Sequence, residues 1–246
     1  MDVSIVVTAY NYAKYLDECL DSCFGQLCTS LKYEVIVVDD GSTDDTQAIL
    51  ARRSDFGLRS LRIENMGVEV ASNHGFSAAR GRYIVRVDAD DILATNYLTS
   101  MAPFMGKGFG FCYSDYTIID SDSVTQEVVR LPDFDAEEIL TRGDFLATGT
   151  LYPAELLHFH GGYDCQTRNT GLENYELIIK LITAGSKGVH VSDPLFYYRR
   201  HQTNMSSTRT DSIIAYGRKL FERNCLGIYR TNKYHPYKLA LSEKTK

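Results

Sequence analysis

The chain has 246 residues and a net charge of −6, with 44% hydrophobic and 24% charged residues, which is ordinary for a globular enzyme. The negative balance argues against a nucleic-acid partner, because nucleic-acid-binding proteins carry a basic face. No apolar run reaches the roughly 18–20 residues that span a bilayer, and the opening stretch lacks the basic flank of a signal peptide. We therefore expect a cytoplasmic protein.

Two compositional features bear on partners and redox state. Residues 218–246 mix basic with aromatic and aliphatic side chains, which leaves peripheral contact with the inner face of a membrane open, although an ordinary surface helix explains the same composition. The six cysteines form no Cys-x-x-Cys pair and lack further ligands at the spacing of zinc sites. We expect them to be reduced, structural thiols.

The first part of the chain alternates short apolar runs with helical patterns. Strands are predicted over 3–8, 34–38, 61–63 and 83–87, and helices over 11–27 with Asn11 as the cap, over 43–51 and over 67–80. This alternation is typical of crossover connections in a mostly parallel, Rossmann-like sheet flanked by helices. The fold class is therefore α/β.

The second part is less regular. A strand over 109–113, helices over 136–146 and 175–184, a late strand over 195–198 and a final helix from about Asp211 are predicted. We find no internal repeat and no linker. The prediction is one domain over residues 1–207, followed by a C-terminal helical extension over 208–246.

Three carboxylates lie within four residues directly after the strand 83–87, at Asp88, Asp90 and Asp91. They repel one another unless a cation joins them, and a hard divalent ion does so while it bridges to a diphosphate. Residues two apart point the same way in an extended segment, so Asp88 and Asp90 are expected to converge on one ligand. A solvated acidic turn, with Asp91 capping the next segment, is the alternative.

Two further polar clusters follow strands at the same edge, where open α/β sheets bind ligands. In the run 39–44, a glycine permits a tight turn, Ser42 or Thr43 can cap the next helix, and a carboxylate can accept hydrogen bonds from a base or ribose. In the run 8–11, Tyr10 suits stacking on a base. A well-made strand-to-helix junction explains the first cluster as well, and plain packing is the commoner role of such a tyrosine.

Six segments together match one known family in order and spacing. They are Thr8-Ala9-Tyr10-Asn11, residues 35–44, Asn65-Met66-Gly67, Asn73-His74-Gly75, residues 79–84 and Asp88-Ala89-Asp90-Asp91. They resemble the inverting family-2 glycosyltransferases of the GT-A fold, closely over residues 1–92 and more loosely to about residue 207. The resemblance implies a GT-A domain in which residues 1–92 bind a nucleotide-sugar and residues 93–207 bind the acceptor.

The resemblance also implies a role for particular positions. The nucleotide-sugar contacts would come from Thr8, Ala9, Tyr10, Asn11, Asp39, Asp40, Asn73, Arg80, Asp88, Ala89, Asp90 and Arg200. Asp90 would ligate a metal on the diphosphate, and Asp88 would contact the ribose or that metal. The implied ion is Mn²⁺ or Mg²⁺, which neutralises the departing nucleoside diphosphate.

An inverting transfer needs a general base that takes the proton of the acceptor hydroxyl as it attacks the anomeric carbon. Similar enzymes draw this base from an acidic pair that opens a helix, commonly from its second member. The pair here is Glu173-Asn174, and an asparagine cannot act as a base. We therefore assign Glu173, with Glu176 as the weaker candidate. The alternative role of Glu173 is to offset the helix macrodipole.

Two more features concern the phosphates. Relatives often carry an arginine before the position of Asn73, where this chain has Ser72, and we hypothesise that Arg80 or Arg86 compensates. After the late strand, similar enzymes place a histidine near the diphosphate or metal, which makes His201 a predicted metal contact beside Arg200. An exposed basic loop is the alternative reading of that segment.

The sequence thus predicts a metal-dependent, inverting transfer of a sugar from a nucleotide-diphosphate sugar, with a UDP-sugar favoured. The acceptor would be a hydroxyl of a glycan or lipid-linked glycan, as in polysaccharide biosynthesis. A non-catalytic nucleotide-sugar-binding protein is one alternative, which Asn174 keeps open. A sugar nucleotidyltransferase is the other, and it is disfavoured because the loop 10–14 after the first strand has no glycine for a triphosphate.

Overall fold

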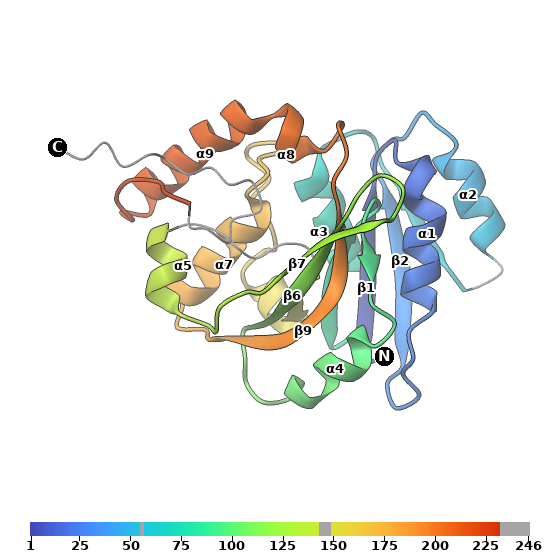
Figure 1. The fold of residues 1–246 in the computed structure, drawn as a ribbon, viewed down its shortest axis with the longest axis horizontal. Coiled ribbons are helices and arrows are strands. Elements are labelled where there is room, and N and C mark those ends of the chain that lie inside the picture. Colours follow the sequence, from blue (N-terminus) through green and yellow to red (C-terminus); the bar gives the residue numbers. More distant parts are fainter. Residues whose placement is uncertain (55–56, 143–148, 232–246) are drawn as a thin grey trace.

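The computed structural model describes residues 1–54, 57–142 and 149–231 (Figure 1). Its strands are β1 (Val3–Ala9), β2 (Tyr33–Asp39), β3 (Arg59–Arg62), β4 (Tyr83–Asp88), β5 (Ile92–Leu93), β6 (Phe111–Ile119), β7 (Thr125–Val129), β8 (Leu151–Pro153) and β9 (Gly188–Arg199). Its helices are α1 (Ala13–Phe24), α2 (Thr46–Arg53), α3 (Val68–Ala78), α4 (Tyr97–Met101), α5 (Ala136–Arg142), α6 (Ala154–Phe159), α7 (Glu173–Thr183), α8 (Met205–Thr208) and α9 (Thr210–Arg223), with a short 3-10 turn at Ala102–Phe104.

The first four long strands form a parallel sheet. β1 lies between β2 and β4, and β3 extends the sheet beyond β2. Every residue of β1 is buried, because α1 and α3 flank the strands on opposite sides (Figure 1). The helix α3 approaches so closely that a Cβ on Gly75 would lie 2.3 Å from Cγ1 of Val6. Ordered crossovers of this kind bring the carboxyl ends of β1, β2 and β4 to one edge.

The second part of the chain makes the sheet mixed. β8 pairs antiparallel with both β4 and β6, β9 runs parallel to β6, and β5 and β7 add antiparallel pairs. The predicted α/β fold with flanking helices is confirmed, but its sheet is less parallel than expected. The strands that change direction, β8 and β5, have three and two residues, too few to show a periodicity.

Two local predictions need correction. Asn11 does not cap α1; its φ is +57°, and its side chain accepts a hydrogen bond from the backbone N–H of Thr43. Asp44, rather than Ser42 or Thr43, caps the first turn of α2, because its Oδ1 accepts from N of Thr46 at 3.1 Å. Asp44 also accepts from the first helical N–H of α1, at Ala13. The two helix starts are therefore tied together by one loop.

The C-terminal predictions are partly covered by the described residues. The helix predicted over 136–146 is seen as α5, which ends at Arg142, and 143–148 lie outside the described residues. The late strand is much longer than predicted, because β9 pairs along the whole of β6. The helix expected from about Asp211 is α9, which packs on α7 through Phe221 and Tyr175. Residues 232–246 lie outside the description, so the domain division at 207 stays a prediction.

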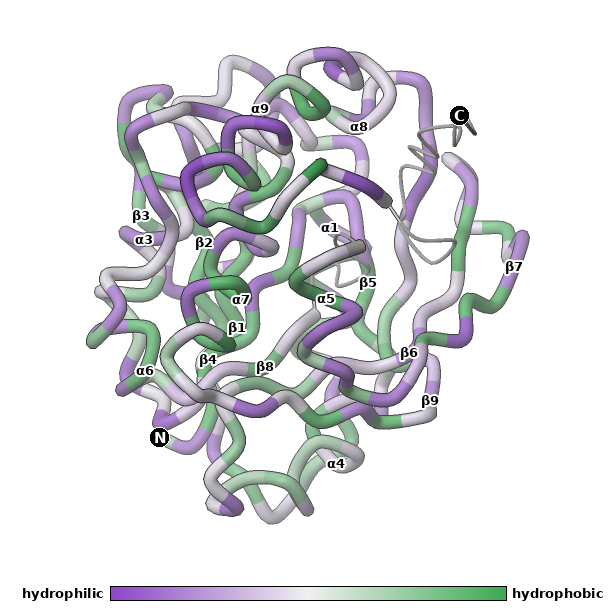
Figure 2. Tube along the Cα trace, turned by 90° about the vertical axis from the view of Figure 1, so that its left-hand side faces the viewer, coloured by the Kyte–Doolittle hydropathy of each residue, from purple (hydrophilic) through white to green (hydrophobic). Residues whose placement is uncertain are grey.

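Hydropathy follows this architecture. In Figure 2 the hydrophobic stretches gather where β1, β4, β8 and α7 meet, and polar stretches follow the outer loops and helices. One core therefore joins the parallel strands to the mixed part of the sheet. Within the described ranges, no helix combines the length and the apolar character needed to cross a bilayer.

Candidate active site

A cleft of about 580 Å³ opens at the carboxyl ends of β1 and β4. Its walls come from the strand ends, the first turns of α3 and α7, and the segment around α8. The lining residues are Thr8, Ala9, Tyr10, Asn11, Tyr12, Asp40, Asn65, Val68, Ala71, Arg86, Asp88, Ala89, Asp90, Asn169, Gly171, Leu172, Glu173, Asn174, Tyr198, Thr203, Asn204, Met205, Ser206, Thr208 and Arg209. The volume is in the range of ligand pockets.

The acidic residues after β4 face different partners. Asp88 is level with Thr8 in the β1–β4 register and borders the cleft. Oδ2 of Asp90 lies 2.9 Å from Nε2 of His201, and Asn204 donates to the same oxygen at 3.3 Å. Asp91 is buried and accepts a hydrogen bond from N of Arg199, so it anchors β9 and does not cap a helix. Asp88 and Asp90 both line the cleft, and their convergence on one ligand stays a prediction.

Arg86 of β4 joins two of the carboxylates. Its Nη2 donates to Oδ1 of Asp88 and its Nη1 to Oε1 of Glu173, the latter at 2.7 Å. The side chains of Arg86 and Glu173 are almost fully buried. Burial raises the pKa of Asp88 to about 6 against the opposing effect of Arg86, and the nearby charges of Asp90 and Glu173 add to the increase. Arg86 therefore holds together a site with an excess of negative charge.

Glu173 begins α7 and lines the cleft. Its carboxylate offsets the macrodipole of that helix, as the alternative role required, and it also faces the cleft. Only Oε1 is bonded to Arg86; Oε2 is buried and has no hydrogen-bond partner among the described residues. Such an unmet acceptor is costly in a fold, and it is often a sign of a functional group.

Two other residues in the first turn of α7, Asn174 and Glu176, have different partners. Asn174 lines the cleft, and its Oδ1 accepts from the hydroxyls of Tyr152 at 2.6 Å and Tyr163 at 3.2 Å. Glu176, the weaker base candidate, is outside the cleft lining and binds the hydroxyl of Tyr216 and the guanidinium of Arg223. It thereby fastens α9 to α7. Of the acids that open α7, Glu173 is the one that reaches the cleft.

The loop before α7 is positioned by Glu69 of α3. The buried carboxylate of Glu69 accepts from N of Asn169 at 2.8 Å and from N of Thr170 at 2.7 Å. In return, the side chain of Asn169 accepts from N of Val68 at 3.1 Å. Local sequence patterns gave no indication of this pairing, because its partners lie about a hundred positions apart in the chain.

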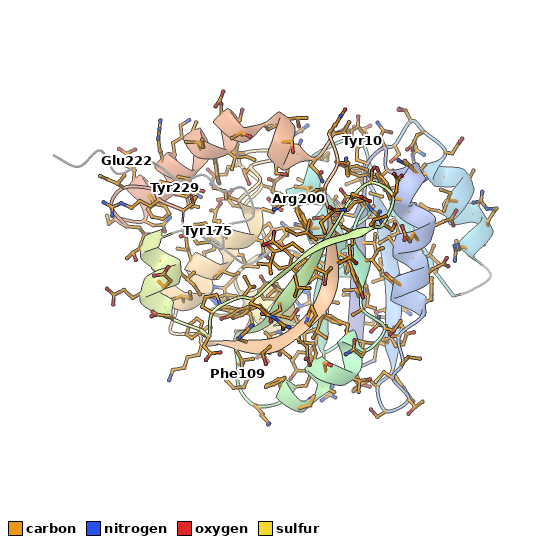
Figure 3. The ribbon with its side chains drawn as sticks, viewed as in Figure 1. Tyr10, Phe109, Tyr175, Arg200, Glu222 and Tyr229 are labelled. Carbon is orange, nitrogen blue, oxygen red and sulfur yellow. The ribbon has the colours of Figure 1, made fainter. Side chains whose placement is uncertain are left out.

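The residues predicted to contact the base and the ribose lie together at the cleft, except for Asp39. Thr8, Ala9, Tyr10, Asn11 and Asp40 all line the cleft. The carboxylate of Asp40 also accepts from the backbone N–H groups of Met66 and Gly67, at 2.7 and 2.9 Å. Figure 3 shows Tyr10 at the upper end of the parallel strands, on the side of α1.

Asp39 is the exception, and its predicted contact with the ligand needs correction. Its side chain is fully buried outside the cleft lining. Oδ1 accepts from N of Ser42 at 2.8 Å, and Oδ2 binds Gln47 and lies 3.4 Å from Arg62. Asp39 therefore builds the strand-to-helix junction, which was the structural alternative.

Three other predicted contacts also lie away from the cleft lining. The amide of Asn73 exchanges two hydrogen bonds with the backbone of Tyr163, at 2.8 and 2.9 Å, so it fastens a loop. Arg80 is exposed at the opposite edge of the sheet, where its N–H donates to Glu34 at the start of β2. Arg200 is exposed, because side chains alternate along β9 and Arg199 takes the inward position. Arg80 thus cannot compensate for Ser72.

Metal binding can be tested against the donors that are present. No cluster of three or more His, Cys, Asp or Glu side chains forms a complete metal site within the ranges described. Asp88 and Asp90 supply oxygen donors of the kind that Mg²⁺ and Mn²⁺ prefer, and a diphosphate and water can supply the remainder. His201 stacks on Tyr15 with ring centres 5.1 Å apart and contacts Asp90, a position that orients a ligating carboxylate. The residues fit a metal shared with a substrate.

Comparison with known proteins agrees with this site. Residues 4–158 match the family model described as glycosyl transferase family 2. Glycosyltransferase GlyG of Streptococcus pneumoniae serotype 4 is 32% identical over 232 residues, which cover 85% of this chain and 74% of GlyG. WfaP of Escherichia coli, a UDP-Glc:alpha-D-GlcNAc-diphosphoundecaprenol beta-1,3-glucosyltransferase, is 29% identical over 86% of this chain and 82% of WfaP.

Solved structures share the fold. S. aureus TarS 1-349 in complex with UDP-GlcNAc has a TM-score of 0.73 at 22% identity, over 89% of this chain and 65% of that one. The mannosyltransferase PcManGT of Pyrobaculum calidifontis, in complex with GDP-Man and Mn²⁺, has a TM-score of 0.70 at 19% identity, over 91% and 64%. The chain therefore spans just under two thirds of these structures, and the predicted GT-A type of fold is confirmed. Because the family model covers more than half of it, the chain belongs to glycosyl transferase family 2 and is a glycosyltransferase.

Proposed function

We propose that the chain transfers a sugar from a nucleotide-diphosphate sugar to a hydroxyl of a glycan or lipid-linked glycan, with inversion at the anomeric carbon. Glu173 is the general base. The observation that carries this assignment is the carboxylate of Glu173, which lines the cleft with one oxygen held by Arg86 and the other without a partner among the described residues. An acceptor hydroxyl that enters the cleft can donate to the unmet oxygen.

The proposed reaction is a single displacement. The acceptor oxygen attacks the anomeric carbon, the bond from that carbon to the phosphate oxygen breaks, and the hydroxyl proton passes to Glu173. The nucleoside diphosphate leaves with the electron pair of the broken bond, and the anomeric configuration inverts. A divalent ion, when held by Asp90 and Asp88, would supply Lewis-acid stabilisation of the leaving diphosphate. Arg86 keeps Glu173 oriented for this role.

The donor and acceptor classes rest on the relatives and on the cleft. TarS is in complex with UDP-GlcNAc and WfaP is named for UDP-Glc, which supports a UDP-sugar, although PcManGT binds GDP-Man. The name of WfaP includes a diphosphoundecaprenol acceptor, which supports a lipid-linked glycan. Residues 1–92 supply the strand-end wall for the donor, and residues 93–207 supply Glu173 for the acceptor.

Calorimetric titration with UDP, GDP, CDP and dTDP, with and without Mn²⁺, tests the donor site. One nucleotide should bind in a metal-dependent way, and Asp90→Ala should abolish that dependence. Glu127→Ala is the matched control, because Glu127 is an exposed acid on β7 outside the cleft lining. A folded wild-type protein that binds none of the four nucleotides would exclude the proposed donor site.

Glu173→Gln tests the base. Donor affinity should stay within about threefold, while transfer should fall by about 10²- to 10⁴-fold, the usual contribution of a general base. Transfer that survives this substitution would place the base elsewhere. A wild-type protein that binds a donor and transfers its sugar to no glycan or lipid-linked acceptor would favour the non-catalytic alternative, which Asn174 leaves open.

A further inference from the structure

The cleft carries more negative than positive side chains, which is unfavourable for a bound diphosphate. Four carboxylates line it, those of Asp40, Asp88, Asp90 and Glu173, against two guanidinium groups, those of Arg86 and Arg209. A shared divalent ion reduces this excess but does not reverse it. A diphosphate that enters the cleft therefore needs a protein cation that is able to turn toward it.

Arg86 and the neighbouring Arg199 are already committed. Both terminal nitrogens of Arg86 are bound to Asp88 and Glu173. Arg199 is buried and donates to the backbone oxygen of Asp90 and to the carboxylate of Glu18. Turning Arg86 to a ligand would leave the buried carboxylate of Glu173 without its partner, which is strongly destabilising, and Arg199 is itself buried with its donors engaged.

Arg209 is in a different position. It is exposed and lines the cleft, and its guanidinium has no ion pair or hydrogen bond to any residue that the structure describes. It lies at the end of α8, where its backbone N–H donates to O of Met205 at 3.0 Å. The backbone of Arg209 is held by this hydrogen bond, and its guanidinium remains available to a ligand.

The segment that carries Arg209 is tied to the acidic strand end. His201 contacts Oδ2 of Asp90 at 2.9 Å, and Nδ2 of Asn204 donates to the same oxygen at 3.3 Å. Asn204 immediately precedes α8, and Thr208 donates back to its carbonyl at 3.1 Å. In Figure 1, α8 lies over the carboxyl ends of the strands, between α9 and α1. Asp90 and Arg209 therefore line the same cleft.

We propose that Arg209 binds the diphosphate of the donor, an inference that rests on the proposed function and extends it. The planar guanidinium can form paired hydrogen bonds to phosphate oxygens. As the bond to the anomeric carbon breaks, negative charge grows on the departing nucleoside diphosphate, and the fixed positive charge stabilises it. Arg209 takes the diphosphate-binding role that was expected of Arg80 or Arg86 as compensation for Ser72, and of Arg200 beside His201.

The test compares nucleotides with nucleosides. UDP and GDP are titrated by calorimetry at fixed Mn²⁺, and the matching nucleoside, uridine or guanosine, is titrated by NMR chemical shifts. Arg209→Ala should lower the affinity for the diphosphate by about tenfold to a hundredfold, the range of a charge-assisted hydrogen bond, and leave the nucleoside affinity unchanged. Arg209→Lys should lie between. Arg218→Ala, an exposed arginine of α9 outside the cleft lining, is the control.

Each remaining outcome is decisive. An unchanged diphosphate affinity in folded Arg209→Ala would overturn the assignment, and so would an equal loss for diphosphate and nucleoside, which would make Arg209 a wall of the base pocket. Wild-type protein that binds none of UDP, GDP, CDP and dTDP would refute the proposed donor site itself, and the role of Arg209 with it. The failure of the inference is thus distinct from the failure of the function.

Discussion

Arg86 and Glu173, 87 positions apart in sequence, form a buried ion pair with a hydrogen bond of 2.7 Å in the lining of the cleft. The same guanidinium binds Asp88, so one cation connects the proposed base to the proposed donor carboxylate. This explains how the carboxylates of Asp88 and Glu173 lie close together. It also explains why Arg86 cannot take the place of a diphosphate-binding arginine, which was one hypothesis drawn from Ser72.

Loss of Arg86 should destabilise the fold. Arg86→Met leaves Glu173 and Asp88 as uncompensated carboxylates, and we expect the free energy of unfolding to fall by about 3–5 kcal/mol, the range for breaking a buried pair. Urea denaturation at pH 7 measures it. The double variant Arg86→Met/Glu173→Gln should lose clearly less than the sum of the single variants. Additive losses would show that the two side chains do not interact energetically.

The sequence identifies much of this cleft because its residues are local to strand ends. Thr8, Tyr10, Asp88 and Asp90 lie at or just after the carboxyl end of a buried strand, and parallel strands place their ends together. The failures have a different physical origin. The carboxylate of Asp39 accepts from the backbone N–H of Ser42 in its own turn, and Arg80 follows the C-terminal end of α3, away from the cleft. Residue type and position in a motif alone did not determine these partners.

Residues contributed by distant segments could not be predicted from the sequence. The hydrogen bonds of Glu69 to the loop before α7, and the ion pair of Arg86 with Glu173, depend on where α7 packs in the fold. The periodicity of the sequence does not indicate this position. Arg209 lies in a short segment whose position over the cleft is set by contacts of His201 and Asn204 with Asp90. The long pairing of β9 with β6 was also missed, because its first residues alternate poorly in burial.

Gly171 should be required for the placement of α7. Its φ is +68°, and a Cβ would lie 2.8 Å from two carbons of Ile213. Gly185, just after the same helix, has a φ of +88° with open space around it, so it is the matched control. Both alanine variants should lose about 1–2 kcal/mol of stability from backbone strain. Only Gly171→Ala should also lower kcat, and equal transfer rates for the two variants would contradict this.

Tyr10 should contribute to nucleotide binding by stacking. It lines the cleft with 43% of its surface exposed, which leaves an aromatic face for a base. Alanine in its place should weaken nucleoside diphosphate binding by about tenfold to a hundredfold, since base–aromatic stacking contributes about 1–3 kcal/mol. Tyr10→Phe should bind normally. Phe159→Ala removes an aromatic that is 82% exposed elsewhere and should have no effect in the same titration.

A second buried carboxylate, Asp115 of β6, stabilises the mixed part of the sheet. It accepts from Arg130 at 2.8 Å, from N of Leu131 at 2.8 Å, and lies 2.8 Å from Nε2 of His190. The opposite nitrogen of His190 faces the exposed Asp133 at 3.2 Å. Burial by itself would raise the pKa of Asp115, but these hydrogen bonds outweigh it and hold the pKa below its ordinary value.

Acid should therefore remove a stabilising contribution of Asp115. Because the pKa is lower in the folded state than the roughly 3.9 of an unfolded aspartate, the contribution is complete at pH 7 and is lost as the pH falls through the folded pKa. Asp115→Asn should lose about 2–3 kcal/mol at pH 7 and show a flatter decline between pH 5 and pH 3 in urea denaturation. Asp133→Asn should follow the wild type. Parallel pH profiles for Asp115→Asn and wild type would mean that Asp115 folds with an unshifted pKa.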